Sequence, residues 1–466
     1  MPELPEVETV KEILKKILIG SKINRVMIFY ERMILSPIKD FEKSLINKEI
    51  RDVTRKGKFL IIHFEDKTVL ITHLRMEGKF IERKANEDVS LYARVVFYLE
   101  DGRKICFDDT RKFGIMKISD EDHYLIEPPI SNLGPEPFYI KDPHYLLEKY
   151  KRIKKPIKEA LLDQSIIAGI GNIYADETLF RCSLHPLTPA NELTLEDCKN
   201  IIENSINVLN KAITLGGSTI RSYHANGIDG KFQNELLAYG KEGQPCANNC
   251  SAHYKKIFVG GRGTTYCPLC QRKRNKVFTI GVTGKIASGK STVIKAFSKN
   301  NIKTLSADNI VNDLYNNEEV KCRVCSLLGS DAYIENKVNK EYIKKIISFN
   351  SKFKENLESI LHPLVYEKIK EFINENMNEK IIVVEVPLLY ETGMDSLFDA
   401  TLAIDASLSD QITNLQKRGS DIDSNLLLNK NNQFDKYKKK LTFLLHTNND
   451  INEVEKQINT IIKQVK

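Results

Sequence analysis

The chain has 466 residues, a net charge of +8, 41% hydrophobic residues and 28% charged residues. This length exceeds a single ordinary hydrophobic core and predicts two or three domains, and the composition excludes a disordered or fibrous protein. No run of about 18 apolar residues occurs, so no transmembrane helix is expected. The first residues lack the basic and apolar regions of a signal peptide. We therefore expect a cytoplasmic protein without membrane contact.

The excess positive charge is concentrated in the first part of the chain. Residues 1–276 contain 44 Lys and Arg against 37 Asp and Glu, whereas residues 277–466 contain 26 against 25. A polyanion such as nucleic acid is therefore an expected partner of the first part. An ordinary basic surface explains the same counts equally well.

The first 130 residues are expected to be rich in strands. Short runs of β-branched and aromatic residues, separated by turn formers, occupy Arg51–Phe64, Val69–Phe80 and Leu91–Phe107. The segment Ile130–Pro143 is rich in proline and turn formers, which is typical of a linker.

A helical region follows the linker. Residues 144–215 carry apolar side chains at spacings of three and four, which predicts helices, and Gly169-Ile-Gly171-Asn172 interrupts this pattern. The glycine-dotted segment Gly216–Gly240 is then expected to be a loop.

Four of the nine cysteines form two close pairs, with the spacing Cys246-x3-Cys250-x16-Cys267-x2-Cys270. In a cytosolic chain such pairs indicate metal ligands rather than disulfides. Four thiolates suit one tetrahedral zinc ion and leave no open position for a catalytic water, so the zinc is expected to be structural. The alternative is four unrelated cysteines. Between the pairs, Arg262 lies in a Gly-rich turn, where it could contact a phosphate backbone or simply face solvent.

From Lys276 onward, strand-like and helix-like segments alternate, which is typical of an α/β fold. A glycine-rich segment that fits G-x4-G-K-S follows the strand-like Val277–Val282 and precedes a helix-like run. Backbone N–H groups there are expected to bind the phosphates of ATP, with Lys290 neutralising charge and Ser291 binding Mg²⁺. The alternative is a glycine turn without a ligand. The expected ATP-binding residues are Gly284, Lys285, Ile286, Ala287, Ser288, Gly289, Lys290, Ser291 and Thr292.

The segment Met1-Pro2-Glu3-Leu4-Pro5-Glu6-Val7-Glu8-Thr9 resembles the start of formamidopyrimidine-DNA glycosylases. Further matches follow in the family's order to about residue 273: Arg55-Lys56-Gly57-Lys58, His73-Leu74-Arg75-Met76-Glu77-Gly78, Arg111-Lys112-Phe113-Gly114, Gly169-Ile170-Gly171-Asn172-Ile173-Tyr174-Ala175-Asp176-Glu177 and Cys267-Pro268-Leu269-Cys270-Gln271. The resemblance implies an enzyme that excises 8-oxoguanine and formamidopyrimidines from double-stranded DNA and cleaves the abasic site by β,δ-elimination.

The resemblance also implies the catalytic groups. Once Met1 is removed, Pro2 carries a free secondary amine that can attack the sugar C1′ and form an iminium. Glu3 is the family's proton shuttle, and Lys58 matches the lysine that assists base release. Many proteins begin with Met-Pro, so Pro2 alone would carry little weight.

Five further residues match the family's DNA-binding positions. Met76, Arg111 and Phe113 correspond to the side chains that fill the space left by a flipped base, although core packing is the alternative for the two apolar ones. Asn172 and Arg262 correspond to phosphate contacts. The chain departs from the family at Lys112 and Thr110, which replace Arg and Pro, and in the three-residue spacing of the first cysteine pair.

The last part of the chain resembles dephospho-coenzyme A kinases over about residues 278–466. The matching segments are Ser306-Ala307-Asp308, His362-Pro363-Leu364, Glu385-Val386-Pro387-Leu388-Leu389-Tyr390-Glu391, Gln411 with Arg418, and Asn448-Asn449. The resemblance implies transfer of phosphate from ATP to the 3′-hydroxyl of dephospho-CoA, with Asp308 as the base and Arg418 stabilising the transferred charge. The alternatives are a helix-capping Asp308 and a surface Arg418.

Four departures from the kinase family are present. Lys285 replaces a usual Gly, Asn414 stands where an Arg is frequent, and Ser306 and Glu385 each replace an Asp. An active glycosylase with a catalytically decayed nucleotide-binding module is therefore the alternative to a bifunctional enzyme. A damage-binding protein without catalysis is a third possibility, which the presence of Pro2, Glu3 and Lys58 argues against.

We therefore predict a multidomain, monomeric protein. Its expected parts are an N-terminal catalytic β-sandwich (1–130), a helix–two-turn–helix DNA-binding domain (131–237), a zinc finger (238–273) and a P-loop kinase-like α/β domain with a parallel sheet (278–466). The expected cofactors are structural Zn²⁺ and Mg²⁺ with ATP, and the expected partners are damaged double-stranded DNA, ATP and dephospho-CoA.

Overall fold

The computed structural model describes residues 2–218, 230–274, 276–417, 427, 431, 434–447 and 450–465. The chain forms two compact units, within each of which most contacts between residues lie. One comprises Met1–Gly240 and Lys256–Tyr266, and the other comprises Lys241–Lys255 and Cys267–Lys466. Within the described part of the chain, no helix is long and apolar enough to cross a membrane.

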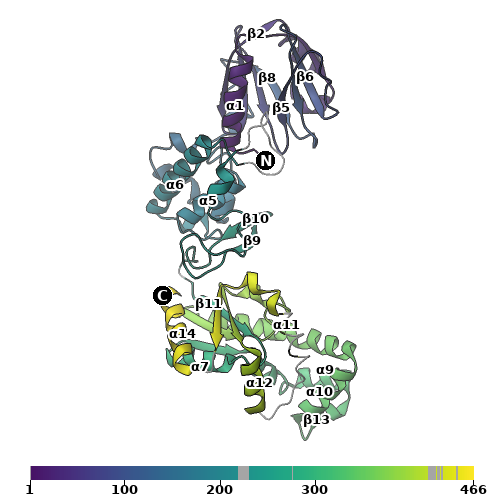
Figure 1. The fold of residues 1–466 in the computed structure, drawn as a ribbon, viewed down its shortest axis with the longest axis vertical. Helices are drawn as coiled ribbons and strands as arrows, with labels where there is room; N and C mark the ends of the chain where they lie inside the picture. Colours follow the sequence, from purple (N-terminus) through teal and green to yellow (C-terminus); the bar gives the residue numbers. More distant parts are fainter. Residues whose placement is uncertain are drawn as a thin grey trace. The chain divides into compact units, whose positions relative to one another are not determined.

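The first unit begins with helix α1 (Leu4–Leu18), followed by an eight-stranded antiparallel sheet in the order β5-β7-β6-β1-β2-β3-β4-β8. The strands are β1 (Lys22–Ile28), β2 (Lys48–Lys56), β3 (Phe59–Phe64), β4 (Thr68–His73), β5 (Lys79–Arg83), β6 (Ala93–Leu99), β7 (Lys104–Asp108) and β8 (Ile115–Asp120), with the short helix α2 (Ile38–Lys43) between β1 and β2. Only two residue pairs join β1 to β2, so the strands fold over there into two layers (Figure 1). The predicted β-sandwich is confirmed.

The core of the sandwich explains the position of α1. Val7, Val10, Leu14 and Leu18 repeat at helical spacing and are buried against strand residues such as Phe64 and Phe107. Pro5 suits the first turn of the helix, where its missing N–H costs no hydrogen bond. The N-terminus of the chain is therefore held by a helix that is itself fixed to the sheet.

Between the sandwich and the cysteines, the described residues form four α-helices: α3 (His144–Tyr150), α4 (Ile157–Leu162), α5 (Asn172–Arg181) and α6 (Leu195–Thr214). Their buried side chains form a separate core that also includes Leu4 of α1, and the N–H of Leu4 donates to the carbonyl of Gly169 (3.1 Å). The start of the chain therefore lies against the turn that precedes α5. Of the predicted loop Gly216–Gly240, residues 219–229 lie outside the described part of the chain.

The cysteine-bearing segment contains one hairpin, β9 (Lys255–Val259) and β10 (Arg262–Tyr266). The carbonyl of Gly263 in β10 accepts a hydrogen bond from the side-chain amide of Asn172 (3.0 Å). The hairpin is thereby fixed to the N-terminus of α5.

The second unit contains a five-stranded parallel sheet in the order β12-β15-β11-β16-β17, as predicted for an α/β domain. Its strands are β11 (Phe278–Gly284), β12 (Lys303–Ser306), β15 (Ile381–Glu385), β16 (Ala400–Ala406) and β17 (Phe443–Thr447), and a small hairpin joins β13 (Tyr333–Ile334) to β14 (Lys337–Val338). The chain order reverses beside β11, and ligands of such sheets bind at the carboxyl ends of the strands at that point.

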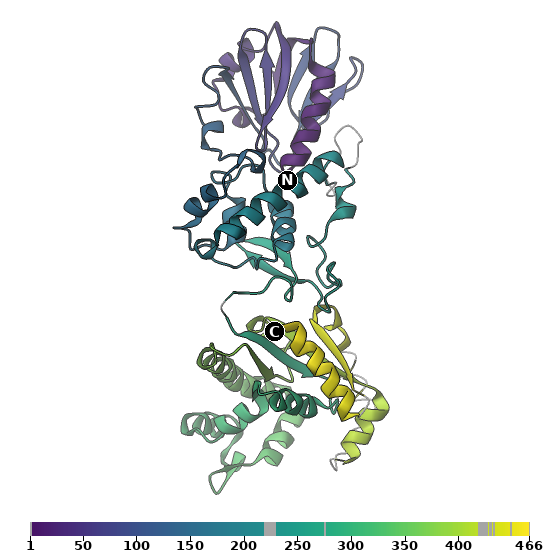
Figure 2. The same cartoon turned by 90° about the vertical axis from the view of Figure 1, so that its left-hand side faces the viewer.

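Seven helices accompany this sheet among the described residues: α7 (Lys290–Lys299), α8 (Ala307–Leu314), α9 (Glu318–Leu328), α10 (Lys340–Phe349), α11 (Ser351–Glu375), α12 (Leu408–Lys417) and α14 (Ile451–Val465). Helices α7 and α14 lie side by side, with α14 running along the sheet (Figure 2). Every residue of β15 and β16 is buried, as expected for parallel strands covered on both faces.

Candidate active sites

The carboxylate of Glu3 lies at the N-terminus of α5. Its two oxygen atoms accept hydrogen bonds from the N–H groups of Ile173 (3.0 Å) and Tyr174 (3.4 Å). Free N–H groups and the helix dipole make this terminus favourable for a negative charge. Pro2, directly before Glu3, is buried, and Met1 lies outside the described residues. The predicted nucleophile and proton shuttle are therefore adjacent, with the shuttle held by backbone donors.

Glu6 lies next to Glu3 and is also buried. Its carboxylate accepts hydrogen bonds from the N–H of Glu3 (2.8 Å), the hydroxyl of Tyr174 (2.7 Å) and the N–H of Ser218 (2.8 Å). Burial raises the pKa of Glu6, and the nearby charge of Glu3 raises it further. Glu6 therefore fixes the backbone that carries Pro2 and Glu3.

Lys58 lies in the turn between β2 and β3 and is 5% exposed. Its ammonium group donates to the carbonyl of Ile170 (2.8 Å), and burial lowers its pKa. Lys58 shares a cavity of about 330 Å³ with Glu3, Met76, Asn172 and Arg262. The structure thus brings five of the predicted site residues to one cavity.

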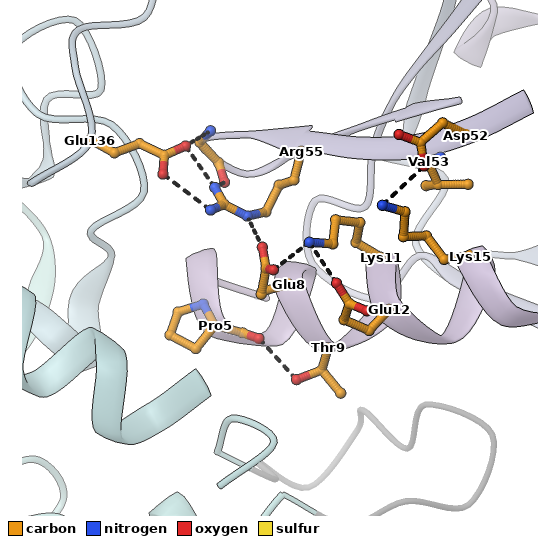
Figure 3. A network of polar contacts seen from close by, with 11 residues as sticks. Pro5, Glu8, Thr9, Lys11, Glu12, Lys15, Asp52, Val53, Arg55 and Glu136 are labelled. Carbon is orange, nitrogen blue, oxygen red and sulfur yellow. Dashed lines mark hydrogen bonds and ion pairs between the residues drawn. The ribbon is translucent and has the colours of Figure 1, made fainter. Parts of the chain in front are cut away.

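The turn that carries Lys58 is held by an ion-pair network (Figure 3). The guanidinium of Arg55 donates to Glu8 (2.7 Å) and, through two nitrogen atoms, to Glu136 (2.7 and 3.1 Å). Glu136 also accepts from the N–H of Gly57 (2.7 Å). Paired carboxylates of this kind restrict a guanidinium in both position and orientation. The network therefore joins α1, β2 and the segment after the sandwich directly beside Lys58.

Two residues that line this cavity, Gln164 and Tyr239, were not predicted from the sequence, and Glu177, the last residue of the Gly169–Glu177 motif, had no role assigned to it. The side chain of Gln164 bonds to the N–H of Gly169 (2.9 Å) and the carbonyl of Ile170 (2.8 Å). Glu177 is fully buried and accepts from the N–H groups of residues 237–239, which brings Tyr239 to the cavity. The Gly169–Glu177 motif was the available signal for Glu177, whereas Gln164 and Tyr239 lie outside the motifs.

Arg111 and Phe113 do not line this cavity but lie in the loop after β7. Asp109 organises this loop: its carboxylate accepts from the N–H groups of Arg111 (3.0 Å), Phe113 (2.9 Å) and Gly114 (2.7 Å). Phe113 is 52% exposed, and the Arg111 guanidinium lies 5.1 Å from its ring centre. Lys112 has a left-handed backbone (φ 59°). An exposed aromatic on a constrained loop suits insertion between bases rather than core packing.

A buried ion pair connects α4, α5 and the hairpin. Lys158 and Asp176 are both fully buried and 2.5 Å apart, and Asp176 also accepts from the N–H of Thr265 in β10 (3.1 Å). Burial raises the pKa of Asp176 to about 6. Together with the Asn172 contact, this pair fixes the hairpin that carries Arg262.

The four cysteines of the predicted zinc site lie together. The sulfur atoms of Cys246, Cys250, Cys267 and Cys270 are all within 4.8 Å of one another, and Cys246 and Cys267 are buried. Four converging thiols with no carboxylate or histidine among them fit a closed, structural zinc site. The zinc prediction is confirmed by this cluster.

The glycine-rich loop connects β11 to α7 at the carboxyl end of the central strand. Gly289 has a left-handed backbone (φ 90°) directly before the helix. The ammonium group of Lys290 donates to the carbonyls of Gly284 (3.1 Å) and Lys285 (2.8 Å). A cavity of about 480 Å³ lies against this loop, and its other walls include His362, Leu388 and Tyr390. The loop and residues of two segments that resemble the kinase family therefore line one cavity.

The other residues predicted for the kinase site do not all lie at this cavity. Asp308 is exposed in the first turn of α8 and does not line the cavity, although β12, which precedes it, ends opposite Glu385 of β15. Asn414 donates to the carbonyl of Ala287 in the loop (2.9 Å). Arg418 and the segment Asn448-Asn449 lie outside the described residues.

Known protein families match both the first part and the second part of the chain. Residues 1–116 match the formamidopyrimidine-DNA glycosylase N-terminal domain and residues 133–224 the formamidopyrimidine-DNA glycosylase H2TH domain. Residues 243–272 match the zinc finger found in FPG and IleRS, and residues 278–453 match dephospho-CoA kinase. These are families of enzymes, a glycosylase in the first part and a kinase in the second.

Individual relatives cover the first part almost completely. The formamidopyrimidine-DNA glycosylase of Bacillus cereus (strain ATCC 10987 / NRS 248) is 41% identical over 275 residues, which are 58% of this chain and 99% of that protein. The enzyme of Oceanobacillus iheyensis is 43% identical over 281 residues, 59% of this chain and 100% of that protein. The solved complex of Lactococcus lactis Fpg with DNA containing an abasic site superposes with a TM-score of 0.56 at 40% identity, covering 58% of this chain and 100% of that one. The chain therefore belongs to the formamidopyrimidine-DNA glycosylase family over its first 275 residues or so, and it continues as a dephospho-CoA kinase domain.

Proposed function

We propose that the first part of the chain binds damaged double-stranded DNA, excises oxidised purines and cleaves the resulting abasic site. The observation that carries this proposal is the position of Glu3, held by the N–H groups at the start of α5, beside buried Pro2 and in one cavity with Lys58. The solved relatives include a Lactococcus lactis complex with Fapy-dG-containing DNA, which supports the same substrate class.

The proposed chemistry begins at the secondary amine of Pro2. The nitrogen attacks C1′, the bond from C1′ to the base breaks, and the base leaves with a proton. The C1′–O4′ bond then breaks, O4′ takes a proton, and the opened sugar is an iminium. Loss of its C2′ proton expels the 3′ phosphate, and a second elimination expels the 5′ phosphate. Glu3 moves protons during these steps, because its carboxylate is beside the amine and is held by backbone donors. Lys58 supplies the charge that assists departure of the base.

Borohydride trapping tests this mechanism. Borohydride reduces an imine to a stable amine, so a duplex containing 8-oxoguanine should become covalently attached to Pro2, as located by peptide mapping. Lys290→Ala, far from this chemistry in sequence, should trap equally well. A protein shown to begin at Pro2 that forms no adduct would mean that the first part binds damage without processing it.

We also propose that the second part transfers phosphate from ATP to the 3′-hydroxyl of dephospho-CoA. The supporting observation is the glycine-rich loop at the carboxyl end of β11, with Lys290 lining a cavity of about 480 Å³. Ser291, at the start of α7, would hold Mg²⁺, which neutralises phosphate charge when bound. Asp308, which is exposed on α8, is the proposed base. Because a base must reach the proton that it removes, the 3′-hydroxyl of the acceptor has to bind beside α8.

A phosphoryl-transfer assay with purified full-length protein tests the kinase. Lys290→Ala should abolish transfer while leaving base excision intact. If the wild-type protein binds ATP but transfers no phosphate, the second part is a nucleotide-binding module that has lost catalysis, which is the alternative that the four departures from the kinase family raise.

A further inference from the structure

Lys285 is a second lysine in the glycine-rich loop, and its side chain has a defined position. Its ammonium group lies 2.6 Å from the carboxylate of Asp405, and each side chain is 12% exposed. Asp405 belongs to β16, which pairs with β11, and the backbone N–H of Lys285 donates to the carbonyl of Ile404 (3.1 Å). The position of the ammonium group is therefore fixed relative to the sheet.

Asp405 lies near three basic side chains, so its carboxylate does not depend on Lys285 alone for a partner. Besides Lys285, its carboxylate lies 3.6 Å from the ammonium group of Lys438 and 3.9 Å from the ring of His446. Lys285 and these neighbours hold the pKa of Asp405 below its usual range, although burial opposes the shift. Lys285 can therefore leave Asp405 without leaving a buried carboxylate unpaired, a state that is strongly unfavourable.

Lys285 also faces the nucleotide side of the loop. It lines the same cavity of about 480 Å³ as Lys290 and Gly284. On α12, the side chain of Asn414 donates to the carbonyl of Ala287 in the loop and carries no charge. A triphosphate carries several negative charges, and Lys290 alone neutralises one of them.

We propose that Lys285 is a phosphate-binding residue of the nucleotide site, which exchanges its partner Asp405 for a phosphate oxygen when ATP binds. The exchange needs only rotation of a flexible side chain, since the backbone of Lys285 stays bonded to β16. This proposal rests on the proposed nucleotide-binding function of the second part of the chain, and it gives the side chain of Lys285, a residue of the predicted loop, a phosphate contact of its own.

Calorimetric titration of the full-length chain with ATP and with AMP, both with Mg²⁺, tests the assignment. Lys285→Met should weaken ATP binding about tenfold and AMP binding much less, because a lost phosphate contact matters most where phosphate charge is greatest. Lys285→Arg should stay within about threefold of wild type, since it keeps the charge. Lys299→Met, which removes a lysine that is 67% exposed at the far end of α7, is the matched control and should bind both as wild type does.

Asp405→Asn separates phosphate binding from a purely structural ion pair. If Lys285 binds phosphate, this change releases it and removes a negative charge nearby, so ATP affinity should be unchanged or higher. If the pair only supports the fold, Asp405→Asn and Lys285→Met should weaken binding of ATP and AMP alike and lower the melting temperature together, which would overturn the proposal.

The binding and turnover measurements have separate meanings. Wild-type protein that binds ATP but transfers no phosphate would refute the proposed kinase activity. The titrations would then still decide whether Lys285 binds phosphate. Lys285→Met protein that binds ATP as tightly as wild type would refute the assignment even in an active kinase. Wild-type protein that binds no ATP would refute both.

Discussion

Gly171 lies so close to Glu3 that a Cβ atom built at position 171 would be 2.2 Å from the carboxyl carbon of Glu3. No side chain therefore fits at position 171 unless Glu3 moves. Glu3 accepts hydrogen bonds from the two residues after Asn172, so this displacement would also separate the carboxylate from its donors at the start of α5. The glycine is required by the proximity of the Glu3 carboxylate.

Gly171→Ala should therefore reduce base excision by about a hundredfold or more, because a shift of about 1 Å at a catalytic group has effects of that size. Single-turnover excision of 8-oxoguanine measures the change. ATP binding by the same protein serves as the control for folding of the second unit. A variant that excises at the wild-type rate would show that Glu3 has another productive position.

The network of Figure 3 predicts a loss of stability when Arg55 is removed. The side chains of Arg55 and Glu136 are only 9% and 6% exposed, so Arg55→Met leaves a carboxylate buried without its partner. The free energy of unfolding of the first unit should fall by about 3 kcal/mol or more. Lys368→Met removes a pair whose side chains are both 55% exposed and should leave stability almost unchanged. Chemical denaturation measures both, and equal effects would contradict the predicted role of burial.

The contacts of Asp109 predict that its removal weakens DNA binding. Its carboxylate is 1% exposed and accepts from three N–H groups of the loop that carries Arg111 and Phe113. Asp109→Ala frees this loop, so affinity for a duplex with a lesion should fall about tenfold or more, while borohydride trapping at an abasic site should fall less. Asp122→Ala, at an exposed position, is the control. Unchanged affinity would mean that the loop keeps its conformation without the carboxylate.

The sequence predicted those parts of the molecule in which residue type and local spacing determine the structure. The cysteine pairs indicated the zinc site because ligand type and number define it. The glycine-rich segment after Val277–Val282 indicated the nucleotide loop because its backbone geometry needs glycine at fixed positions.

The remaining features depend on contacts between residues far apart in the chain. Glu136 meets Arg55 across 81 positions, and Asp176 meets Thr265 across 89. Nothing in the local sequence around either carboxylate indicates its partner. The pairing of Lys285 with Asp405 is of the same kind: the sequence showed an unusual lysine in the loop, and only the sheet pairing of β11 with β16 showed which carboxylate holds it.

His73 predicts a pH dependence of stability. Burial lowers its pKa from 6.5 to about 3, with the charges of Arg75 and Lys58 contributing. The unfolded chain therefore binds a proton between these pH values that the folded protein does not bind, so the stability due to neutral His73 is present above pH 6.5 and is lost as the pH falls toward 3. His73→Asn, which keeps an acceptor for the N–H of Arg75, should reduce the slope of stability against pH in this window by up to one proton. His123→Gln replaces an exposed histidine whose pKa is raised by Asp120 and should leave that acid-side loss in place. Thermal unfolding of the first unit at several pH values measures the slopes, and a His73→Asn slope equal to that of wild type would contradict a neutral, buried ring.

Removal of zinc should affect DNA binding through the hairpin that carries Arg262. The two cysteine pairs flank this hairpin, and its carbonyl at Gly263 bonds to Asn172 at the start of α5. Chelation, or the double change Cys250→Ser and Cys270→Ser, should release the hairpin and weaken binding to a duplex with a lesion by about a hundredfold, because Asn172 and Arg262, the two predicted phosphate contacts, lose their relative position. Phosphoryl transfer to dephospho-CoA should persist, since the glycine-rich loop and its cavity contain none of these cysteines. Zinc content, DNA affinity and phosphoryl transfer are measured on the same preparation. Unchanged DNA affinity in protein without zinc would contradict the role of the hairpin, and loss of both activities together would contradict the independence of the kinase.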